Sequence, residues 1–368
     1  MTQDSAGVSR HVVWAEIGPA RFPVCIGPGE TARIGTLWAE RDAGDAALVI
    51  FDGAVAAHAQ TVADHLRDIG IRVVPVPVVP GERSKSLTEL ERICRVAARE
   101  GIRRSDVVVA IGGGVVGDLA GFVAASYQRG IRLVHVPTTL LAMVDSAIGG
   151  KAGVDLPEAK NYVGAIWQPE FVIMDTEVLA TLPARELSCG FAEIVKYGLL
   201  DSVELFDRVE RWPSPLPGDA VAVVGLIRDC VAHKLDVVAQ DERELGVRAS
   251  LNLGHTVGHG IEAAAGYGRY HHGEAISLGL LAALRISHEV CGAPLEWRDR
   301  TQTVLERHGL PTRLDPDVAV EEILAAMGRD KKATAASFNM VLIDEPGTVL
   351  LRQNPPHDVV VAAIEELR

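Results

Sequence analysis

The sequence predicts an α/β domain with a largely parallel sheet, followed by a mostly α-helical domain. In the first half, short apolar runs rich in β-branched residues alternate with amphipathic stretches, as in successive βα units. Beyond about residue 180, long stretches with helical spacing of apolar residues dominate. The chain has 368 residues, and single cores stop growing near roughly 250–300 residues. We therefore expect two domains, 1–180 and 181–368.

Each element of the first domain follows from its own local pattern. After a polar N-terminus, residues 46–51 (AALVIF) read as a buried strand, and residues 55–69 as the helix that follows it. A strand at 71–79 leads into a turn and a helix at 86–100. The remaining strands expected in this domain are 106–111, 131–136 and 171–174.

The second domain is predicted to be built mainly of helices. Their expected ranges are 184–199, 218–239, 249–265, 274–291, 298–308 and 318–327. A strand-like run follows at 340–343.

Composition excludes several classes of function. Lys and Arg number 36 against 49 acidic residues, a formal charge of −13, and no basic block stands out, so nucleic acid is not an expected partner. An anionic small substrate is compatible with local clusters of cations. The five scattered cysteines lack a CxxC spacing, which favours free thiols in the cytoplasm. No signal peptide and no run of about 18 apolar residues is visible, so no membrane association is expected.

Residues 251–274 concentrate four histidines in one short segment: His255, His259, His271 and His272. His255 and His259 are one helical turn apart, so their imidazoles project from the same face. A single such histidine is more often a helix cap or a satisfied core group, but this concentration favours a metal or catalytic site. A catalytic zinc takes three protein ligands, so a third must come from elsewhere. Close backbone approach is provided by Gly254, Gly258 and Gly260.

One candidate for the third ligand lies in the apolar helix containing FAEIVKYG. Glu193 and Lys196 are one turn apart and could simply form an i, i+3 ion pair. Alternatively, Glu193 supplies an oxygen ligand that completes a set of two histidines and one glutamate.

The segment GGGVVGD follows a predicted strand and opens a helix. Gly112, Gly114 and Gly117 satisfy G-x-G-x-x-G, which lets backbone amides approach a pyrophosphate, although a tight βα turn has the same pattern. The acidic residue expected about 20 positions later is missing, and Asp52, at the end of an earlier strand, could bind the ribose instead. We infer a nucleotide-binding fold with a rearranged site.

Two further loop regions carry polar side chains that could contact an anion. In VPTTLLAMVDSAIGGKAG, hydroxyls and charges flank a Gly-Gly turn, and Lys160 and Asn161 follow nearby. The alternative is a set of solvated loop charges. Farther along, Arg248 to His259 could present a cation, an amide and two imidazoles along one helical stripe. The run Arg329–Lys332 is usually a solvated helix end, but its lysines could reach a substrate.

Several motifs in register resemble the 3-dehydroquinate synthases, members of the sugar phosphate cyclases. They are GGGVVGDLAGFVAASYQRG, VPTTLLAMVDSAIGGKAGV, KNYVGAIWQP, TLPARELSCGFAEIVKYG and LNLGHTVGHGIEA with HHGEA, spread from about residue 52 to 332. The resemblance implies a Rossmann-like α/β NAD-binding domain, an α-helical metal-binding domain and an active site between them. It also implies a homodimer.

The implied reaction converts 3-deoxy-D-arabino-heptulosonate 7-phosphate to 3-dehydroquinate and phosphate. In it, NAD⁺ transiently oxidises an alcohol, phosphate is eliminated, the ketone is reduced again, and an aldol closure forms the ring. NAD⁺ is thus regenerated in each turnover.

The resemblance assigns residues to three groups. The ligands of Zn²⁺, or Co²⁺, are Glu193, His255 and His272. Substrate and proton-transfer positions are Lys151, Asn161, Lys196, Lys234, Arg248, Asn252, His259, one of Lys331 and Lys332, and Arg129 from the partner of a dimer. The NAD positions are Asp52, Glu82, Lys85, Gly113, Gly114, Val115, Val116, Gly117, Asp118, Thr138, Thr139, Asp145, Lys151, Lys160, Val178, Leu179, Ala180 and Thr181.

The chain departs from the family pattern at two places. Asp155 replaces an expected Asn, and His271 adds a second imidazole beside the presumed ligand His272. The alternatives are another sugar phosphate cyclase of the amino-dehydroquinate, 2-deoxy-scyllo-inosose or valiolone type, a metal-dependent alcohol dehydrogenase, and a non-catalytic homologue. Lys234, Arg248 and Asn252 together favour a carboxylate-bearing sugar phosphate.

Overall fold

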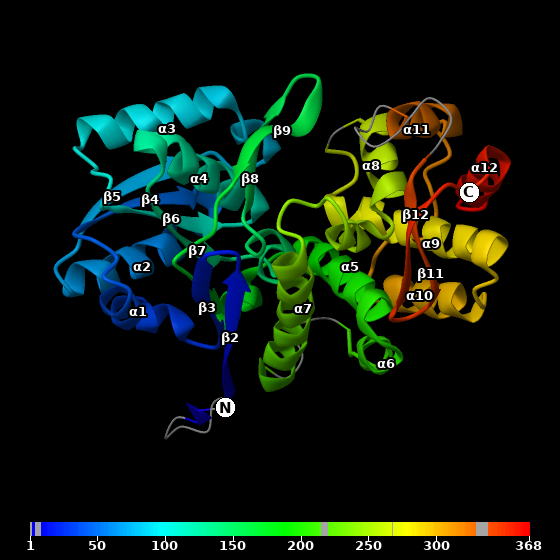
Figure 1. Cartoon of the computed structure of the whole chain (residues 1–368), viewed down its shortest axis with the longest axis horizontal. Helices are drawn as coiled ribbons and strands as arrows, with labels where there is room; N and C mark the ends of the chain where they lie inside the picture. Colours follow the sequence, from blue (N-terminus) through cyan, green and yellow to red (C-terminus); the bar gives the residue numbers. More distant parts are fainter. Residues whose placement is uncertain (1, 4–8, 215–219, 267, 329–337) are drawn as a thin grey trace. The chain divides into compact units, whose positions relative to one another are not determined.

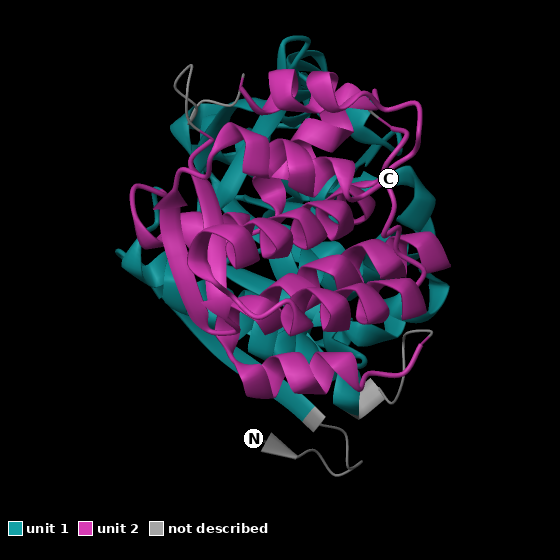
Figure 2. Cartoon of the chain, turned by 90° about the vertical axis from the view of Figure 1, so that its right-hand side faces the viewer, with its two compact units in different colours: residues 1–182, 219–243 teal, residues 183–218, 244–368 magenta. Residues whose placement is uncertain are grey.

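A computed structural model describes residues 2–3, 9–214, 220–266, 268–328 and 338–368. The chain forms two compact units (Figure 2). Unit 1 comprises Met1–Leu182 and Asp219–Arg243, and unit 2 comprises Pro183–Gly218 and Glu244–Arg368. The second segment of unit 1 differs from the predicted division, which assigned everything after residue 180 to the second domain. Within the described part of the chain, no helix combines the length and apolar character that crossing a bilayer requires.

Unit 1 is built on an eight-stranded sheet in the order β1-β2-β3-β10-β7-β6-β4-β5. Strands β2 to β7 of this sheet are labelled in Figure 1. The first two pairings are antiparallel and the five from β3 to β5 are parallel. The strands are β1 (Thr2–Gln3), β2 (Ser9–Ile17), β3 (Ala20–Gly27), β4 (Ala46–Asp52), β5 (Arg72–Val78), β6 (Val107–Gly112), β7 (Arg132–Pro137) and β10 (Phe171–Asp175).

Helices cover both faces of this sheet, which explains the continuous apolar runs of its strands. Leu48 and Ile50 of β4 face the side covered by α3 (Leu87–Arg99) and α4 (Gly114–Ser126). Ala47 and Val49 face the side covered by α1 (Ile34–Glu40) and α2 (Ala56–Asp68). Alternate residues of one strand therefore anchor two separate cores.

Short helical turns and a second hairpin complete the first segment of unit 1. The turns are η1 (Glu30–Arg33), η2 (Gly53–Val55), η3 (Glu82–Ser84), η4 (Tyr127–Arg129), the π-helical η5 (Ala142–Ser146) and η6 (Thr176–Thr181). An antiparallel hairpin of β8 (Lys151–Leu156) and β9 (Ala159–Ile166) packs against α4. This hairpin was expected only as a loop, because its small and polar residues give no alternating apolar pattern.

The helix α7 (Ala220–Gln240) belongs to unit 1 and corrects the predicted domain division. It packs against β2, β3, η5 and η6 rather than continuing the helical unit. Helical periodicity identified this helix correctly, but periodicity says nothing about which core a helix joins.

Unit 2 is mostly helical and is organised around α9. Its helices are α5 (Ala184–Asp201), α6 (Val203–Glu210), α8 (His255–Ala264), α9 (His272–Cys291), α10 (Glu296–Arg307), α11 (Val320–Met327) and α12 (His357–Glu365), with the turn η7 (Val247–Asn252). A hairpin of β11 (Met340–Glu345) and β12 (Thr348–Gln353) also packs in this unit. α9 contacts α5, α8, α10, α12 and β11.

One predicted helix, 249–265, is interrupted in the structure. Residues Val247–Asn252 form a 3-10 turn, and Gly254 adopts a left-handed conformation (φ 76°) before α8 begins at His255. The predicted single stripe from Arg248 to His259 is therefore wrong. Of the residues in that stripe, only His255 and His259 lie on α8 and share one helical face.

Candidate metal centre and nucleotide site

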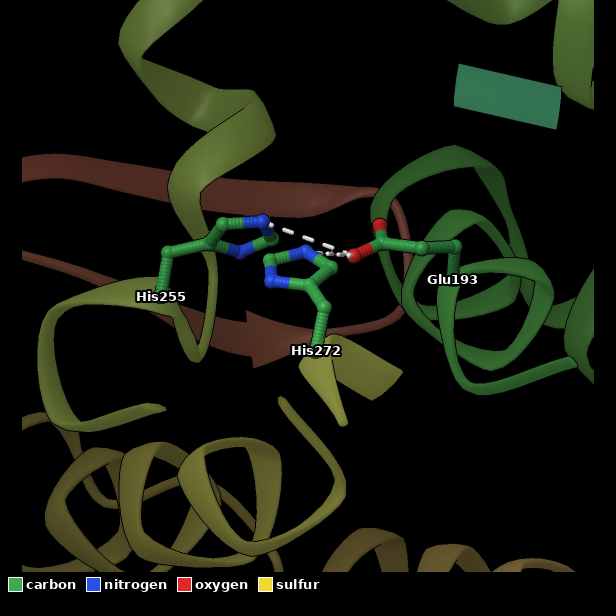
Figure 3. Close-up of side chains that lie close together, drawn as sticks. All are labelled: Glu193, His255 and His272. Atoms are coloured by element: carbon green, nitrogen blue, oxygen red, sulfur yellow. Dashed lines mark hydrogen bonds and ion pairs between the residues drawn. The ribbon is translucent and has the colours of Figure 1, made fainter. Parts of the chain in front are cut away.

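Three potential metal ligands converge in unit 2 from three different helices (Figure 3). Glu193 comes from the middle of α5, whereas His255 and His272 are the first residues of α8 and α9. Glu193 Oε1 lies 3.2 Å from His272 Nε2 and 3.4 Å from His255 Nε2. The structure thus brings together the three side chains that the sequence singled out as ligands, and their ligand atoms lie within 4.8 Å of one another.

This geometry fits a divalent metal ion. Ligands bound at about 2.0–2.2 Å in a tetrahedron lie roughly 3.3–3.6 Å apart, close to the two separations from Glu193 Oε1. Two imidazoles and one carboxylate form a donor set that catalytic zinc uses, with one position open to water or substrate. Glu193 is fully buried, an environment in which a carboxylate needs a compensating positive charge.

The second nitrogen of each imidazole also faces an oxygen. His255 Nδ1 lies 3.1 Å from the carbonyl oxygen of Leu253, and His272 Nδ1 lies 3.5 Å from Glu262 Oε2. A proton held on Nδ1 leaves Nε2 with the lone pair that a metal requires. Both rings are therefore turned so that Nε2 points toward Glu193.

The two imidazoles experience opposite electrostatic environments. Burial lowers the pKa of His255 to about 3, which keeps this ring neutral. Burial also lowers the pKa of His272, but Glu193 and Glu262 outweigh it and raise that pKa to about 10. A metal ion entering this cluster must therefore displace a proton from His272.

Close backbone contacts hold the three ligand helices together. A Cβ on Gly273 would lie 2.2 Å from the Cys189 carbonyl oxygen of α5, and one on Gly258 would lie 3.1 Å from the Ala275 carbonyl oxygen of α9. Gly254 and Gly260 likewise face backbone atoms, of Leu280 and Ile323. The expectation that glycines here permit close approach is confirmed.

An ion pair fixes the N-terminus of α9, where His272 lies. Arg185 of α5 makes two bonds, of 2.6 and 2.7 Å, to the Glu274 carboxylate. Glu274 in turn accepts the backbone amide of His271 in a capping box. His271 directs Nδ1 to Glu186, 3.1 Å away, so the structure places His272 rather than His271 beside Glu193.

The other predicted site residues of unit 2 lie near this cluster or on η7. Lys196 is buried and its Nζ lies 2.5 Å from Glu193 Oε2, so Glu193 makes the predicted ion pair with one oxygen and faces the histidines with the other. The His259 ring is exposed, with its centre 5.3 Å from that of His255 and 6.0 Å from that of His272. Asn252 donates to Glu244 (2.6 Å), and Arg248 is buried on η7. Lys331 and Lys332 lie outside the described residues.

In unit 1, the predicted nucleotide residues collect where the strand order reverses. The chain moves from β4 to one side for β5 and to the other for β6, so the carboxyl ends of β4 and β6 flank a topological switch point. Asp52 ends β4 and accepts the amide of Ala54, and the Cβ of Asp52 lies 3.3 Å from the position that a Gly112 Cβ would occupy. This is the place where open parallel sheets bind nucleotides.

The glycine-rich turn at the end of β6 approaches two neighbouring hydroxyl residues. A Cβ on Gly113 would meet Thr139 at 3.1 Å, and one on Gly114 would meet Ser146 at 3.1 Å. Thr138 donates its amide to the Gly112 carbonyl (2.9 Å). Val115, Val116, Gly117 and Asp118 follow in the first turns of α4. The N-terminus of α4 therefore lies beside both predicted threonines.

A buried lysine connects several other predicted nucleotide residues. Lys85 Nζ donates to Asp118 Oδ2 and to Asn161 Oδ1, and lies 4.0 Å from Glu82. Burial alone would lower the pKa of Lys85, but Asp118 and the other nearby carboxylates raise it above its ordinary value. Burial raises the pKa of Glu82 above its ordinary value. The nearby charge of Lys160 acts in the opposite direction but does not cancel this effect.

The remaining predicted positions of unit 1 lie on separate elements. Lys234 of α7 donates to the carbonyl and to Oδ1 of Asp145, both at 2.7 Å. Lys151 is exposed at the start of β8, and Arg129 is exposed at the end of η4. Val178, Leu179, Ala180 and Thr181 form the end of η6.

Sequence reasoning missed three acidic partners of these residues. Glu262 faces His272, Glu244 accepts from Asn252, and Asp155 accepts the amide of Asn161 (2.7 Å). Glu262 carried a usable signal, because it is three residues after His259 and seven after His255, on the same helical face. Glu244 and Asp155 are brought to their partners by turns, which no comparable spacing in the sequence predicts.

Comparisons with known proteins cover nearly the whole chain. Residues 75–189 match the family described as 3-dehydroquinate synthase N-terminal, and residues 190–333 match 3-dehydroquinate synthase C-terminal. The 3-dehydroquinate synthase of Gloeobacter violaceus is 43% identical over 350 residues, which cover 94% of this chain and 96% of that protein. That of Symbiobacterium thermophilum is 42% identical over 359 residues, covering 96% and 99%.

Solved structures agree with this result. A 2-deoxy-scyllo-inosose synthase complexed with carbaglucose-6-phosphate, NAD⁺ and Co²⁺ has a TM-score of 0.86 at 25% identity, covering 97% of this chain and 100% of that one. A 2-epi-5-epi-valiolone synthase from Streptomyces hygroscopicus, with NAD⁺ and Zn²⁺ bound, has a TM-score of 0.83 at 26% identity, covering 96% and 98%. With two matching family models and relatives above 40% identity, the chain belongs to the 3-dehydroquinate synthase family.

Proposed function

We propose that the chain converts 3-deoxy-D-arabino-heptulosonate 7-phosphate to 3-dehydroquinate and phosphate, the second step of the shikimate pathway. The observation that carries this proposal is the convergence of Glu193, His255 and His272 in a chain about 40% identical to 3-dehydroquinate synthases. The enzyme is then a phosphate-eliminating lyase that uses NAD⁺ and a divalent metal, Zn²⁺ or Co²⁺. Related cyclases solved with NAD⁺ and Co²⁺ or Zn²⁺ support this cofactor assignment.

When bound, NAD⁺ and the metal supply reversible hydride transfer and Lewis acidity at a substrate hydroxyl. Glu193, His255 and His272 hold the metal. The N-terminus of α4 and the carboxyl ends of β4 and β6 hold the dinucleotide, because free amides there favour a pyrophosphate. Asp52 accepts the ribose hydroxyls, and Thr138 and Thr139 line the same strand ends.

The substrate carries a phosphate and a carboxylate, and the chain offers several buried cations to bind them. Lys196, Lys234 and Arg248 are each at least nine-tenths buried. Lys196 Nζ lies 2.5 Å from Glu193 Oε2 and Lys234 Nζ lies 2.7 Å from Asp145 Oδ1, so in this proposal the substrate anions join these carboxylates around cations that the fold already holds in place. Lys151, Asn161 and Asn252 contribute further polar contacts. The ring of His259 is exposed and its centre lies 5.3 Å from that of His255, which supports a role in proton transfer.

A panel of phosphorylated sugars tests the substrate assignment against other cyclases of the same fold. Purified protein with Zn²⁺ and NAD⁺ is supplied with the heptulosonate phosphate, with sedoheptulose 7-phosphate or with glucose 6-phosphate, and released phosphate is measured. We expect phosphate release only from the heptulosonate, because only it has the carboxylate. Faster release from a sugar without the carboxylate would assign the chain to the inosose or valiolone type.

We propose that the active form of the protein is a homodimer in the cytoplasm. The structure shows no disulfide among the described residues, which suits a reducing compartment. By resemblance, Arg129 acts in the site of the partner subunit. Refolding equal amounts of inactive Arg129→Ala and His255→Ala chains together should then restore about a quarter of the sites, since a mixed dimer has one complete site. No recovery of activity would show that Arg129 does not act across subunits.

A further inference from the structure

Glu262 is a buried acidic residue of unit 2 for which the proposed reaction supplies no role. It lies on α8, on the same helical face as His255 and His259, and its side chain is 7% exposed. Its Oε2 is 3.5 Å from His272 Nδ1, on the side of the ring opposite to Glu193. A carboxylate at this depth is costly unless it is paired, and His272 provides a partner.

We propose that Glu262 is a positioning residue that holds His272 in the tautomer and orientation required for metal binding. This inference rests on the proposed function, since it concerns the same metal centre. The Glu262 carboxylate keeps the imidazole proton on Nδ1, so that Nε2 presents its lone pair toward Glu193 and His255. A carboxylate behind a ligating histidine also makes the ligating nitrogen a stronger donor.

The other histidine of the cluster, His255, provides a comparison for His272. His255 Nδ1 faces a backbone carbonyl, that of Leu253, at 3.1 Å. Both rings therefore have an oxygen behind them and Nε2 in front, but only His272 has a charged partner that mutation can remove. His272 is the first residue of α9, so the helix fixes its backbone. The rotation of its ring is not fixed by the helix and depends on a partner such as Glu262.

A competing interpretation assigns Glu262 to a second metal site. His259, Glu262 and His272 also offer ligand atoms within 4.8 Å of one another. Such a site would use His272 Nδ1 as a ligand, whereas the proposal has Nδ1 protonated. The two interpretations therefore predict different numbers of bound metal ions.

The test measures metal binding by the full-length protein without relying on turnover. Metal-free wild type, E262Q and E262A are titrated with Co²⁺ in competition with a chelator, and the visible d–d absorption and the stoichiometry are recorded. E186Q is the matched control, because Glu186 faces the neighbouring His271 in the same way, at 3.1 Å. Circular dichroism of the metal-free proteins checks folding, and E262Q, which preserves size, decides the matter if E262A does not fold.

We expect one Co²⁺ per chain, bound about 10- to 100-fold more weakly by E262A and less severely weakened in E262Q, whose amide oxygen still accepts from Nδ1. The d–d bands of E262Q should shift, because the donor strength of His272 changes, while E186Q matches the wild type. Wild-type affinity and spectra in both Glu262 variants would overturn the positioning role but leave the proposed function intact. A second Co²⁺ that E262Q loses would also overturn it. A wild type that binds no Co²⁺ would instead overturn the proposed metal centre itself.

Discussion

The two carboxylate oxygens of Glu193 contact different groups. Oε2 lies against the ammonium of Lys196, and Oε1 faces the Nε2 atoms of His255 and His272. The lysine offsets part of the cost of burying the carboxylate, and the remaining oxygen completes a three-ligand set. The local ion pair and the metal ligand, which sequence reasoning treated as alternatives, are therefore compatible.

Replacing individual histidines tests the ligand assignment. His255→Ala should remove tightly bound metal, because two remaining ligands seldom retain a catalytic zinc. Metal content after dialysis, measured by plasma mass spectrometry, checks this outcome. His271→Ala is the control and should retain one ion per chain, since His271 faces Glu186. Loss of metal in His271→Ala with retention in His255→Ala would reverse the assignment.

His135, a buried histidine of unit 1, makes the stability of the fold depend on pH. Burial lowers the pKa of His135 on β7 to about 4, below its ordinary value of 6.5. Between these values the unfolded chain binds a proton that the folded chain does not, so stability falls as pH drops from about 6.5 to 4, by about 3 kcal/mol in total. Urea denaturation of His135→Gln should show a weaker pH dependence over this range. The exposed His357→Gln is the control, and equal pH dependence of His135→Gln and wild type would contradict this account.

How far the site could be predicted depended on how its residues are brought together. Helical spacing singled out His255 and His259 but left Glu193 open between an ion pair and a ligand. The assignment of Glu193 as a ligand and the choice of His272 over His271 came from family resemblance. The contact between Glu262 and His272 depends on the packing of α8 against α9, which no local pattern specifies. Ring orientation in particular is a property of tertiary structure.

The helices that carry the metal ligands are joined by contacts that admit only glycine. Gly273 touches the backbone of Cys189, and Gly279 touches that of Gly254, where an added Cβ would lie 2.1 Å from the carbonyl oxygen. These contacts set the spacing of α5, α8 and α9, and therefore the distances among their ligands. The proposed metal centre thus depends on the glycines as much as on Glu193, His255 and His272.

Adding a single methyl group at this interface should disturb both stability and metal binding. In Gly273→Ala the new Cβ meets backbone atoms of α5 that cannot rotate away, so we expect a loss of about 3 kcal/mol or more in the free energy of unfolding. Metal affinity should fall as well, because His272 moves relative to Glu193. Chemical denaturation and Co²⁺ titration measure the two effects.

Gly225→Ala is the control for this substitution. Among the described residues, no atom apart from the chain neighbours and the backbone of the same helix lies within 4 Å of an added Cβ at this position of α7, so the change should be neutral or stabilising by up to about 1 kcal/mol. Equal effects of the two substitutions would show that the contact with Cys189 is not responsible.

Several elements with a clear period were predicted well, but α6, α12 and the strands β2 and β3 were not predicted. The strand at 46–51 and the helix at 86–100 match β4 and α3 within a residue or two. The hairpin of β8 and β9 was missed because glycines and charged residues replace the alternating apolar pattern. The prediction of a helix at 249–265 failed at Gly254, because the left-handed conformation there interrupts the helix and favours glycine, a poor helix former.

At the scale of the whole molecule, the cofactor and metal residues are divided between the two units. The switch point of the parallel sheet is in unit 1, together with the predicted NAD residues. The metal cluster, with Lys196 and Arg248, is in unit 2. A chain that folds only one unit correctly would therefore lack either hydride transfer or the metal.

The ratio of product to NAD⁺ tests the central claim most directly. Metal-loaded protein is given an excess of the heptulosonate phosphate with NAD⁺ at a small fraction of its concentration, and phosphate, 3-dehydroquinate and NADH absorbance are followed together. The proposed function predicts equal amounts of phosphate and 3-dehydroquinate, far beyond the NAD⁺ supplied, with little net NADH. NADH accumulating in a one-to-one ratio with the product would contradict it and indicate an ordinary dehydrogenase.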